Sequence, residues 1–132
     1  MAYDNAKSYY TAMLEGLDMN FLLGEDNLSP KAPQIATMEL NQNSITVKQA
    51  EEYCNKYNVS INGLMCSAFG FVLAKYAGTD YSVFNTVYSG RNDSRKTDTV
   101  AMLVKTIPVV CNIDKESTSE IAKTVSGQLI DS

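Results

Sequence analysis

Residues Ser60–Asp93, SINGLMCSAFGFVLAKYAGTDYSVFNTVYSGRND, contain a helix and a strand around which we expect the domain to form. Ile61 to Ala77 is apolar nearly all round, as expected of a helix buried between layers. Ser60 can cap its start, and Gly78 can end it in the left-handed conformation. Tyr81 to Tyr88 is rich in β-branched and aromatic residues, which predicts a strand. Small residues on the helix would allow close packing: Gly63, Ser67, Ala68, Gly70 and Ala74.

The residues before this stretch predict two helices and one strand. Asp4 can cap a helix that runs to about Leu17, and a polar segment with two prolines follows at Gly24 to Pro33. Ile35 to Leu40 predicts a strand, and Thr46 begins the next helix. One face of that helix is expected to be buried and the opposite face to be solvated. The buried face comprises Val47, Ala50, Tyr53, Cys54 and Tyr57, and the solvated face Lys48, Glu51, Glu52 and Lys56.

The residues after it predict one strand and one helix. Met102 to Ile113 favours a strand, in which Pro108 removes a backbone donor and so indicates an edge strand or a bulge. Ser117 and Glu120 form a capping box for a last helix. That helix carries Ile121, Val125 and Leu129 at helical spacing. The expected order is α-β-α-α-β-β-α, which predicts a single layered α+β domain.

Composition excludes several classes of protein. The net charge of −4 argues against a general nucleic-acid binder, and the longest apolar run, Leu64 to Ala77, is too short to span a bilayer. The spacings of Cys54, Cys66 and Cys111 fit neither a zinc site nor a disulfide framework, so we expect reduced, buried thiols in a cytoplasmic protein. The 132 residues include no histidine, so the segment lacks the commonest general base and metal ligand. It therefore offers no catalytic residue and no metal site.

The sequence Ser89-Gly90-Arg91 directly follows the predicted strand Tyr81 to Tyr88, and Arg91 is the first of only two arginines. One interpretation is a solvated turn, because Ser, Gly, Asn and Asp favour turns. Another is an anion site in which Gly90 allows close backbone approach and Arg91 and Arg95 are ligands, although no Walker-type lysine follows. The residues themselves leave both interpretations open.

Ser60–Asp93 together with Val100–Ile113, VAMLVKTIPVVCNI, resembles the condensation domain of nonribosomal peptide synthetases, a family with the chloramphenicol-acetyltransferase fold. Its most specific parts are Ser-Gly-Arg after a strand and Val100 to Val109, which is similar to the family's Val/Ile-Gly-x-Phe-Val-Asn-Thr motif. Tyr9 to Asp18 resembles the helix that precedes this half. The resemblance extends from about Ile35 to Leu129. It implies that residues 1–132 are a partial condensation domain, a layered half-domain from the C-terminal subdomain.

The resemblance implies a role for Arg91. In the family, the arginine of Ser-Gly-Arg pairs inside the protein with the aspartate of a His-His-x-x-x-Asp-Gly motif, which this chain lacks. A guanidinium suits that task because its planar fork binds a carboxylate through two hydrogen bonds and stays charged when buried. Ser89, Gly90 and Arg91 would then form a structural clamp on a catalytic loop that precedes the region covered here.

The second motif departs from the family at three positions. Ala101 replaces the glycine, Leu103 the phenylalanine and Lys105 the asparagine, whereas Val100, Val104 and Thr106 match. The family's asparagine lies near the substrate channel, so the resemblance places Lys105 and Thr106 along that channel. Strand alternation puts Lys105 on the face of Ile107 and Val109, where a lysine needs a partner or a watery tunnel. Alternatively, its stem carries the charge to solvent.

Two functions of different classes follow. In the first, the chain is a fragment of an enzyme that joins acyl and aminoacyl groups, which carrier proteins hold as thioesters on phosphopantetheine. The segment itself would be inactive and would need no cofactor, and its partners would be the rest of the domain and the carrier proteins. In the second, the chain is a self-contained interaction module without catalysis. Because the helix Ile61 to Ala77 needs cover on nearly every side, we also expect the fragment to form homo-oligomers.

Overall fold

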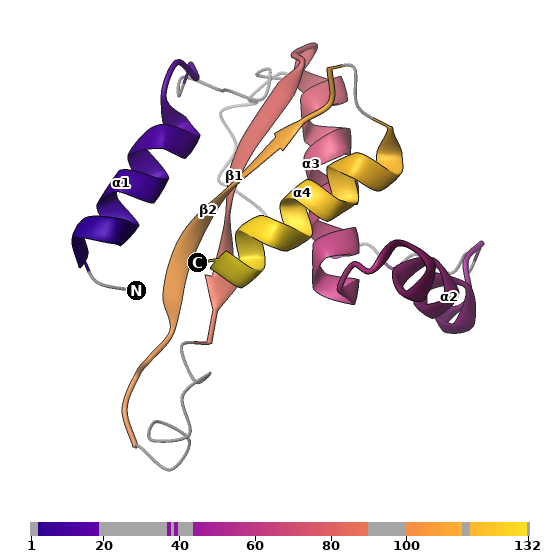
Figure 1. Ribbon diagram of the computed structural model, residues 1–132. Helices are drawn as coiled ribbons and strands as arrows, with labels where there is room; N and C mark the ends of the chain where they lie inside the picture. Colours follow the sequence, from indigo (N-terminus) through magenta and orange to yellow (C-terminus); the bar gives the residue numbers. More distant parts are fainter. Residues whose placement is uncertain are drawn as a thin grey trace.

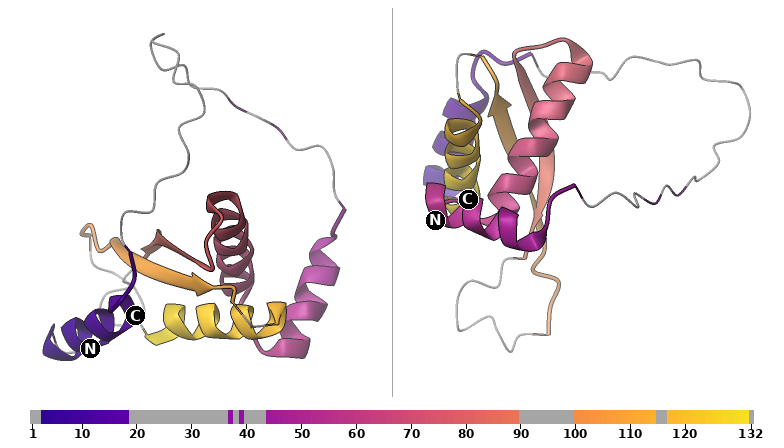
Figure 2. Two further views of the ribbon diagram at one scale, coloured as in Figure 1. Left: turned by 90° about the horizontal axis from the view of Figure 1, so that it is seen from above. Right: turned by 90° about the vertical axis from the view of Figure 1, so that its right-hand side faces the viewer.

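Two strands form an antiparallel hairpin that carries helices on its faces (Figures 1 and 2). The computed structural model describes residues 3–18, 37, 39, 44–89, 100–114 and 117–131. Their elements, in order, are α1 (Tyr3–Leu14), α2 (Val47–Tyr57), α3 (Ile61–Ala77), β1 (Tyr81–Tyr88), β2 (Lys105–Asn112) and α4 (Thr118–Asp131). Helices α3 and α4 pack on each other and on the hairpin, and in Figure 1 α1 lies to the left of the hairpin and α3 to its right. The mixed α/β content agrees with the prediction.

The predicted strand Ile35 to Leu40 lies outside the described residues, except for Thr37 and Glu39, which belong to neither a helix nor a strand. The described elements therefore follow the order α-α-α-β-β-α. The predicted polar linker, Gly24 to Pro33, also falls outside the described part of the chain.

Helix α3 packs against its neighbours through small residues, as the sequence predicts. A Cβ atom on Gly63 would lie 2.7 Å from the Cβ of Ser126 in α4, and one on Gly70 would lie 2.5 Å from the Cβ of Cys111 in β2. Real Cβ atoms do not approach so closely, so both positions require glycine in this packing. Ser67 and Ala74 are buried on the same side. Ala68 is exposed, and its predicted part in the packing is wrong.

The other side of α3 is open, which contradicts the prediction of a helix buried nearly all round. Apolar side chains follow one another along this side at intervals of three or four residues and form what we call the α3 stripe. The α3 stripe comprises Ile61, Met65, Phe69, Val72 and Tyr76, which are 46% to 64% exposed. The hairpin and α4 cover one side of the helix only. Its uniform apolarity therefore indicated how much cover the helix needs and not how much the described residues supply.

The core lies between α3, α4 and the hairpin. Its main cluster consists of Cys66, Val109, Cys111, Ile121 and Val125, and a smaller one near α2 contains Cys54, Val59 and Ala122. The hydroxyl of Ser82, which is fully buried, donates to the carbonyl of Gly70 at 2.8 Å and so satisfies a polar group inside this core. All three cysteines are buried and free, as predicted from their spacing.

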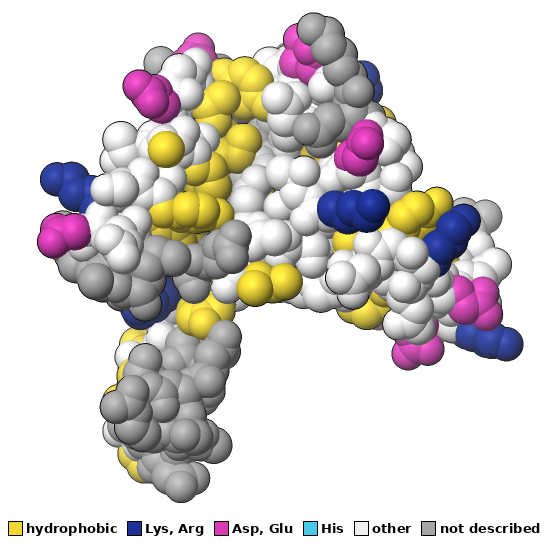
Figure 3. Space-filling view, in the orientation of Figure 1, with side chains coloured by type: hydrophobic (Ala, Val, Ile, Leu, Met, Phe, Trp, Pro, Cys, Tyr) yellow, Lys and Arg dark blue, Asp and Glu magenta, His cyan; other side chains and the backbone are white. Residues whose placement is uncertain are grey.

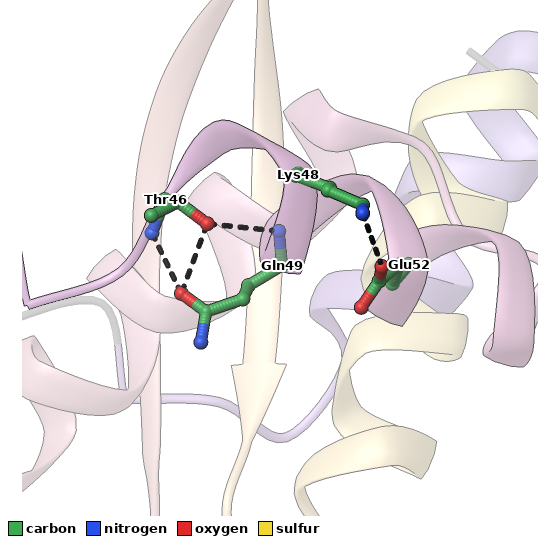
Figure 4. Close-up of polar contacts among 4 residues, drawn as sticks. All are labelled: Thr46, Lys48, Gln49 and Glu52. Carbon is green, nitrogen blue, oxygen red and sulfur yellow. Dashed lines mark hydrogen bonds and ion pairs between the residues drawn. The ribbon is translucent and has the colours of Figure 1, made fainter.

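Capping interactions fix the start of each helix from α2 onward. Thr46 and Gln49 form a capping box at α2 (Figure 4), so Thr46 stands just before the helix it was predicted to begin. Ser60 Oγ accepts from the Gly63 N–H at 2.9 Å and caps α3. Gly78, with φ of 68°, ends that helix as predicted. In α2 the predicted apolar face is only partly correct. Cys54 is buried, but Val47 is 75% exposed.

The predicted capping box at α4 is confirmed. The Ser117 N–H donates to Glu120 Oε2 at 3.0 Å, and the Glu120 N–H donates to Ser117 Oγ. The hydrogen bond from the Ser117 backbone, aided by the Ser117 hydroxyl, lowers the pKa of the Glu120 carboxyl. The cap is therefore strongest above the ordinary pKa of a glutamate and is lost as the pH falls through the lowered value.

The first helix differs from its prediction at both ends. It begins at Tyr3, so Asp4 lies in its first turn instead of at its cap, and it ends at Leu14 instead of near Leu17. Gly16 adopts φ of 75° in the turn that follows, and the Leu17 N–H donates to the Leu14 carbonyl. A glycine in the left-handed conformation commonly terminates a helix, which accounts for the earlier end.

Strand β1 has the predicted bounds, whereas β2 is shorter than predicted. The ladder joins Tyr81 to Asn112 at one end and Tyr88 to Lys105 at the other. Residues Met102 to Val104 have no strand opposite them because β1 ends at Tyr88, so they lie outside β2. Pro108 sits opposite Asn85 in an uninterrupted register, which supports the predicted edge strand and excludes the predicted bulge.

We expect Gly70→Ala to destabilise the fold by about 1–3 kcal/mol, because the new methyl group would overlap Cys111 and displace α3 from β2. Gly127 in α4 is the matched control, since a Cβ there meets nothing within 4 Å. Gly127→Ala should stabilise the helix by about 0.5–1 kcal/mol. Urea unfolding followed by circular dichroism measures both effects. Equal stability of the two variants would contradict the tight α3–β2 contact.

Candidate functional site

Three of the residues predicted for the clamp and the channel, Ser89, Lys105 and Thr106, lie at one end of the hairpin. Tyr88, the last residue of β1, pairs with Lys105, the first of β2, and Val87 pairs with Thr106. Ser89 follows this pair directly. We call the group Tyr88, Ser89, Lys105 and Thr106 the loop end of the hairpin, because β1 ends and β2 begins there, away from the turn that joins α3 to β1 (Figure 1). Gly90 and Arg91 lie outside the described residues.

Most side chains at the loop end are in contact with solvent. Ser89, Lys105 and Thr106 are all exposed. Lys105 has the same strand parity as Ile107, Val109 and Cys111, which are buried, but it stands beyond the last core residue of β2. The structure thus agrees with the interpretation in which the stem of Lys105 carries its charge to solvent.

Exposed apolar side chains border the loop end. Val100, Met102 and Val104, in the segment that leads into β2, are at least half exposed, and Val87 in β1 is 68% exposed. Met102 to Val104 were predicted inside a strand, so this surface was not predicted. Val100, Met102 and Val104 belong to the motif Val100 to Val109, so the described residues leave the start of the motif uncovered.

A pocket of about 270 Å³ opens between α2, α3 and α4. Its walls are mostly apolar, and Tyr53, Leu64, Ser67, Ala68, Phe71, Val72, Thr118 and Ile121 line it. The Ser67 hydroxyl already donates to the Leu64 carbonyl at 2.8 Å. No carboxylate or amine lines the pocket, so it offers no general acid or base. This pocket was not predicted, because a helix that is apolar all round does not reveal which side remains open.

Charged groups and metal ligands do not gather in the described residues. Lys48 and Glu52 form an exposed ion pair on α2 with Nζ and Oε1 3.9 Å apart (Figure 4), worth about 0.3–0.5 kcal/mol. In the described ranges, no three His, Cys, Asp or Glu side chains are placed to hold a metal ion. On the face drawn in Figure 3, hydrophobic side chains gather between α1 and α4.

No single helix of the described segments is long and apolar enough to cross a membrane. Helices α2 and α3 would meet the criteria of length and composition only as a pair, and they are bent by 97° at their junction.

Comparison with known proteins gives one consistent result. The family model for the condensation domain matches residues 1–132. Nonribosomal peptide synthetase sidN of Epichloe festucae (strain Fl1) is 32% identical over 131 residues, which cover 96% of this chain and 3% of that protein. Bacitracin synthase 3 of Bacillus licheniformis is 29% identical over 122 residues, 86% of this chain and 2% of that protein. The chain thus spans 2% to 3% of the length of these two relatives.

Solved structures agree on the fold. The first condensation domain of the calcium-dependent antibiotic synthetase superposes with a TM-score of 0.71 at 16% identity, covering 97% of this chain and 30% of that one. The epimerization domain from the third module of tyrocidine synthetase B gives a TM-score of 0.52 at 26% identity, covering 65% of this chain and 21% of that one. At 16% identity the first likeness shows the fold alone, and this fold is the one that the sequence predicted.

Proposed function

The chain belongs to the condensation-domain family, and from this premise we propose that it is part of the C-terminal subdomain of a condensation domain in a nonribosomal peptide synthetase. The observation that carries the proposal is the match of the family model to all of residues 1–132, a chain without histidine. The solved condensation domain is more than three times as long as the part this chain covers. The family's histidine motif would lie in that further part.

The parent enzyme would form an amide bond between two carrier-bound substrates. The amine nitrogen of a downstream aminoacyl thioester attacks the carbonyl carbon of an upstream acyl or peptidyl thioester. The carbon–sulfur bond breaks, the upstream carrier regains its phosphopantetheine thiol, and the amine loses a proton. A histidine outside this chain would assist the attack. The described residues would contribute a scaffold and a wall of the channel, and the segment itself would bind no cofactor.

Ser89, Gly90 and Arg91 would connect this scaffold to the catalytic loop. The support is positional. Ser89 comes directly after the Tyr88–Lys105 pair, so the backbone that leads to Arg91 starts from a residue held by the ladder. A guanidinium three residues beyond the strand end at Tyr88 has a short tether and a limited range of positions, as a clamp requires. Lys105 and Thr106, exposed at the same end, would line the channel.

One observation favours the alternative, a self-contained interaction module. The α3 stripe is a continuous apolar surface, and such surfaces on soluble proteins commonly bind other proteins. The coding sequence on both sides of this chain separates the two functions. An upstream His-His-x-x-x-Asp-Gly motif and a downstream adenylation domain would establish the first, and their absence would leave the second.

The isolated chain should form no peptide bond, because it contains no histidine to assist the amine. Carrier-bound acyl and aminoacyl substrates mixed with it should yield no product above background in mass spectrometry. Product well above background would show that the assigned mechanism is wrong.

In the intact parent, Arg91→Ala should reduce stability and activity far more than Arg95→Ala. Only Arg91 occupies the clamp position, and loss of its charge would leave a buried aspartate unpaired at a cost of about 3–5 kcal/mol. Urea unfolding and a peptide-formation assay on both variants measure the difference. Equal and mild effects would support the solvated-turn interpretation instead.

The isolated chain should associate through the α3 stripe at micromolar concentration. The stripe presents on the order of 500 Å² of apolar surface, at the upper end for a monomer. A twofold pairing would bury about twice that area, near the lower limit for a stable interface. Phe69→Lys should dissociate the assembly in analytical ultracentrifugation, whereas Val47→Lys, at an apolar residue of α2 that is 75% exposed, should not. A wild-type monomer at high concentration would favour the self-contained module.

A further inference from the structure

Asn62 and Gly63, in the first turn of α3, form the only Asn-Gly pair among the 132 residues. An asparagine before a glycine can deamidate, because the glycine nitrogen can attack the side-chain carboxamide carbon and no side chain on the glycine hinders it. The new carbon–nitrogen bond closes a succinimide ring, and the carboxamide nitrogen leaves as ammonia with the proton that the backbone amide loses. Water then opens the ring, at one carbonyl to aspartate and at the other to isoaspartate.

The structure of α3 keeps the two reacting groups apart. The Gly63 N–H donates to Ser60 Oγ at 2.9 Å, so the nitrogen that would attack retains its proton and is directed at the cap. Asn62 Oδ1 accepts from Cys66 Sγ at 3.7 Å, one helical turn later. The carboxamide is therefore directed along α3 toward Cys66, whereas ring closure requires its carbon beside the Gly63 nitrogen.

Contacts with α4 hold this first turn in place. Helix α4 crosses α3 (Figure 1), and Gly63 is buried against Ser126. Ser126 Oγ accepts from the Ser60 N–H at 3.1 Å and lies 3.3 Å from Ser60 Oγ. One serine of α4 thus contacts both the residue that caps α3 and the glycine that would react. Opening of the turn therefore requires that these contacts between the two helices break.

The packing of α3 on α4 also preserves the reactivity of the pair. A Cβ atom at Gly63 would lie 2.7 Å from the Cβ of Ser126, so this contact requires glycine. The same absence of a side chain makes glycine the least hindered residue that can follow an asparagine. Asn62 itself is exposed to water. The interaction that protects the pair in the closed helix thus leaves it reactive once the helix opens.

We propose that Asn62–Gly63 is a self-modification site, which the capped first turn of α3 protects and which opening of that turn activates, with water as the second reactant. The inference concerns the chemistry of this chain alone and does not depend on the proposed function.

The two products of the reaction have opposite consequences for the fold. Aspartate at position 62 places a carboxylate in the first turn of α3, where the helix dipole favours it. Isoaspartate adds a methylene group to the main chain immediately before Gly63 and moves this glycine away from its place opposite Ser126. The second product prevents α3 from packing on α4. A chain that stays open for long enough therefore loses the ability to refold.

Peptide mapping by mass spectrometry measures the reaction, because deamidation changes the mass and the two products separate in chromatography. At alkaline pH, Asn62 of the full chain should deamidate at least about tenfold more slowly in buffer than in guanidinium chloride. Asn55 of α2, which is followed by a lysine, is the internal reference for a hindered asparagine. Equal rates for Asn62 in the two solvents would show that the folded turn gives no protection and would overturn the proposal.

Two variants that each remove a helix cap test whether the protection is local. Ser60→Ala removes the acceptor of the Gly63 N–H and should accelerate deamidation of Asn62 in buffer about fivefold. Thr46→Ala removes the cap of α2 and is the matched control, which should leave the rate at Asn62 unchanged. Equal acceleration by both variants would assign the reaction to global unfolding. That result, or a rate that Ser60→Ala does not change, would overturn the proposal.

Refolding provides a measurement that does not depend on the mass change. Wild-type chain held in guanidinium chloride for increasing times should lose the fraction that refolds on dilution, followed by circular dichroism, in proportion to the isoaspartate formed. Asn62→Gln keeps a carboxamide but would close a larger ring more slowly, so this variant should retain its refolding. Asn62→Asp, which carries the other product, should refold after a brief exposure as the wild type does. An equal loss of refolding in wild type and Asn62→Gln would refute the assigned site.

Discussion

The close approach of α3 to the hairpin at Gly70 is the contact on which the rest of the domain depends. The α carbon of Gly70 faces the Cβ and Sγ atoms of Cys111, and the Gly70 carbonyl accepts from the buried Ser82 hydroxyl. The helix is therefore attached to both strands at one point, by packing to β2 and by a hydrogen bond to β1. Seven residues earlier, Gly63 allows Ser126 of α4 an equally close approach. Two glycines on α3 thus determine where both the sheet and the last helix lie.

How far the sequence predicted the fold depended on whether the determining interactions are local. The caps at Thr46, Ser60 and Ser117 and the stop at Gly78 involve residues at most four positions apart, and all of them were predicted. The first residue of β2, Lys105, is set by the last residue of β1, Tyr88, which lies 17 positions earlier in the chain. The prediction therefore began β2 too early, at Met102. Ala68 and the α3 stripe were misplaced because apolar character alone does not specify which partner covers which side.

The candidate site shows the same difference between local features, which were predicted, and features that depend on distant residues, which were not. The strand register brings Ser89 and Lys105 to one end of the hairpin, and this proximity was not predicted because the sequence does not specify which residues of the two strands pair. The sequence left two interpretations of Lys105 open, because its exposure depends on which elements cover that end of β2. Arg91 lies outside the described residues, so its part in a clamp stays a prediction from the family motif.

Polar and apolar groups are satisfied to different degrees in this chain. In the described residues every buried side-chain nitrogen and oxygen atom has a hydrogen-bond partner, so the polar interior is complete. The apolar surface is not fully covered, because the α3 stripe and the apolar residues that border the loop end of the hairpin, Val87, Val100, Met102 and Val104, are exposed. Hydrogen bonds are mostly made between neighbouring elements, whereas cover for a core helix must come from whole layers. A piece of a larger fold would keep the first and lack the second, and this combination agrees with the proposed place of the chain in a condensation domain.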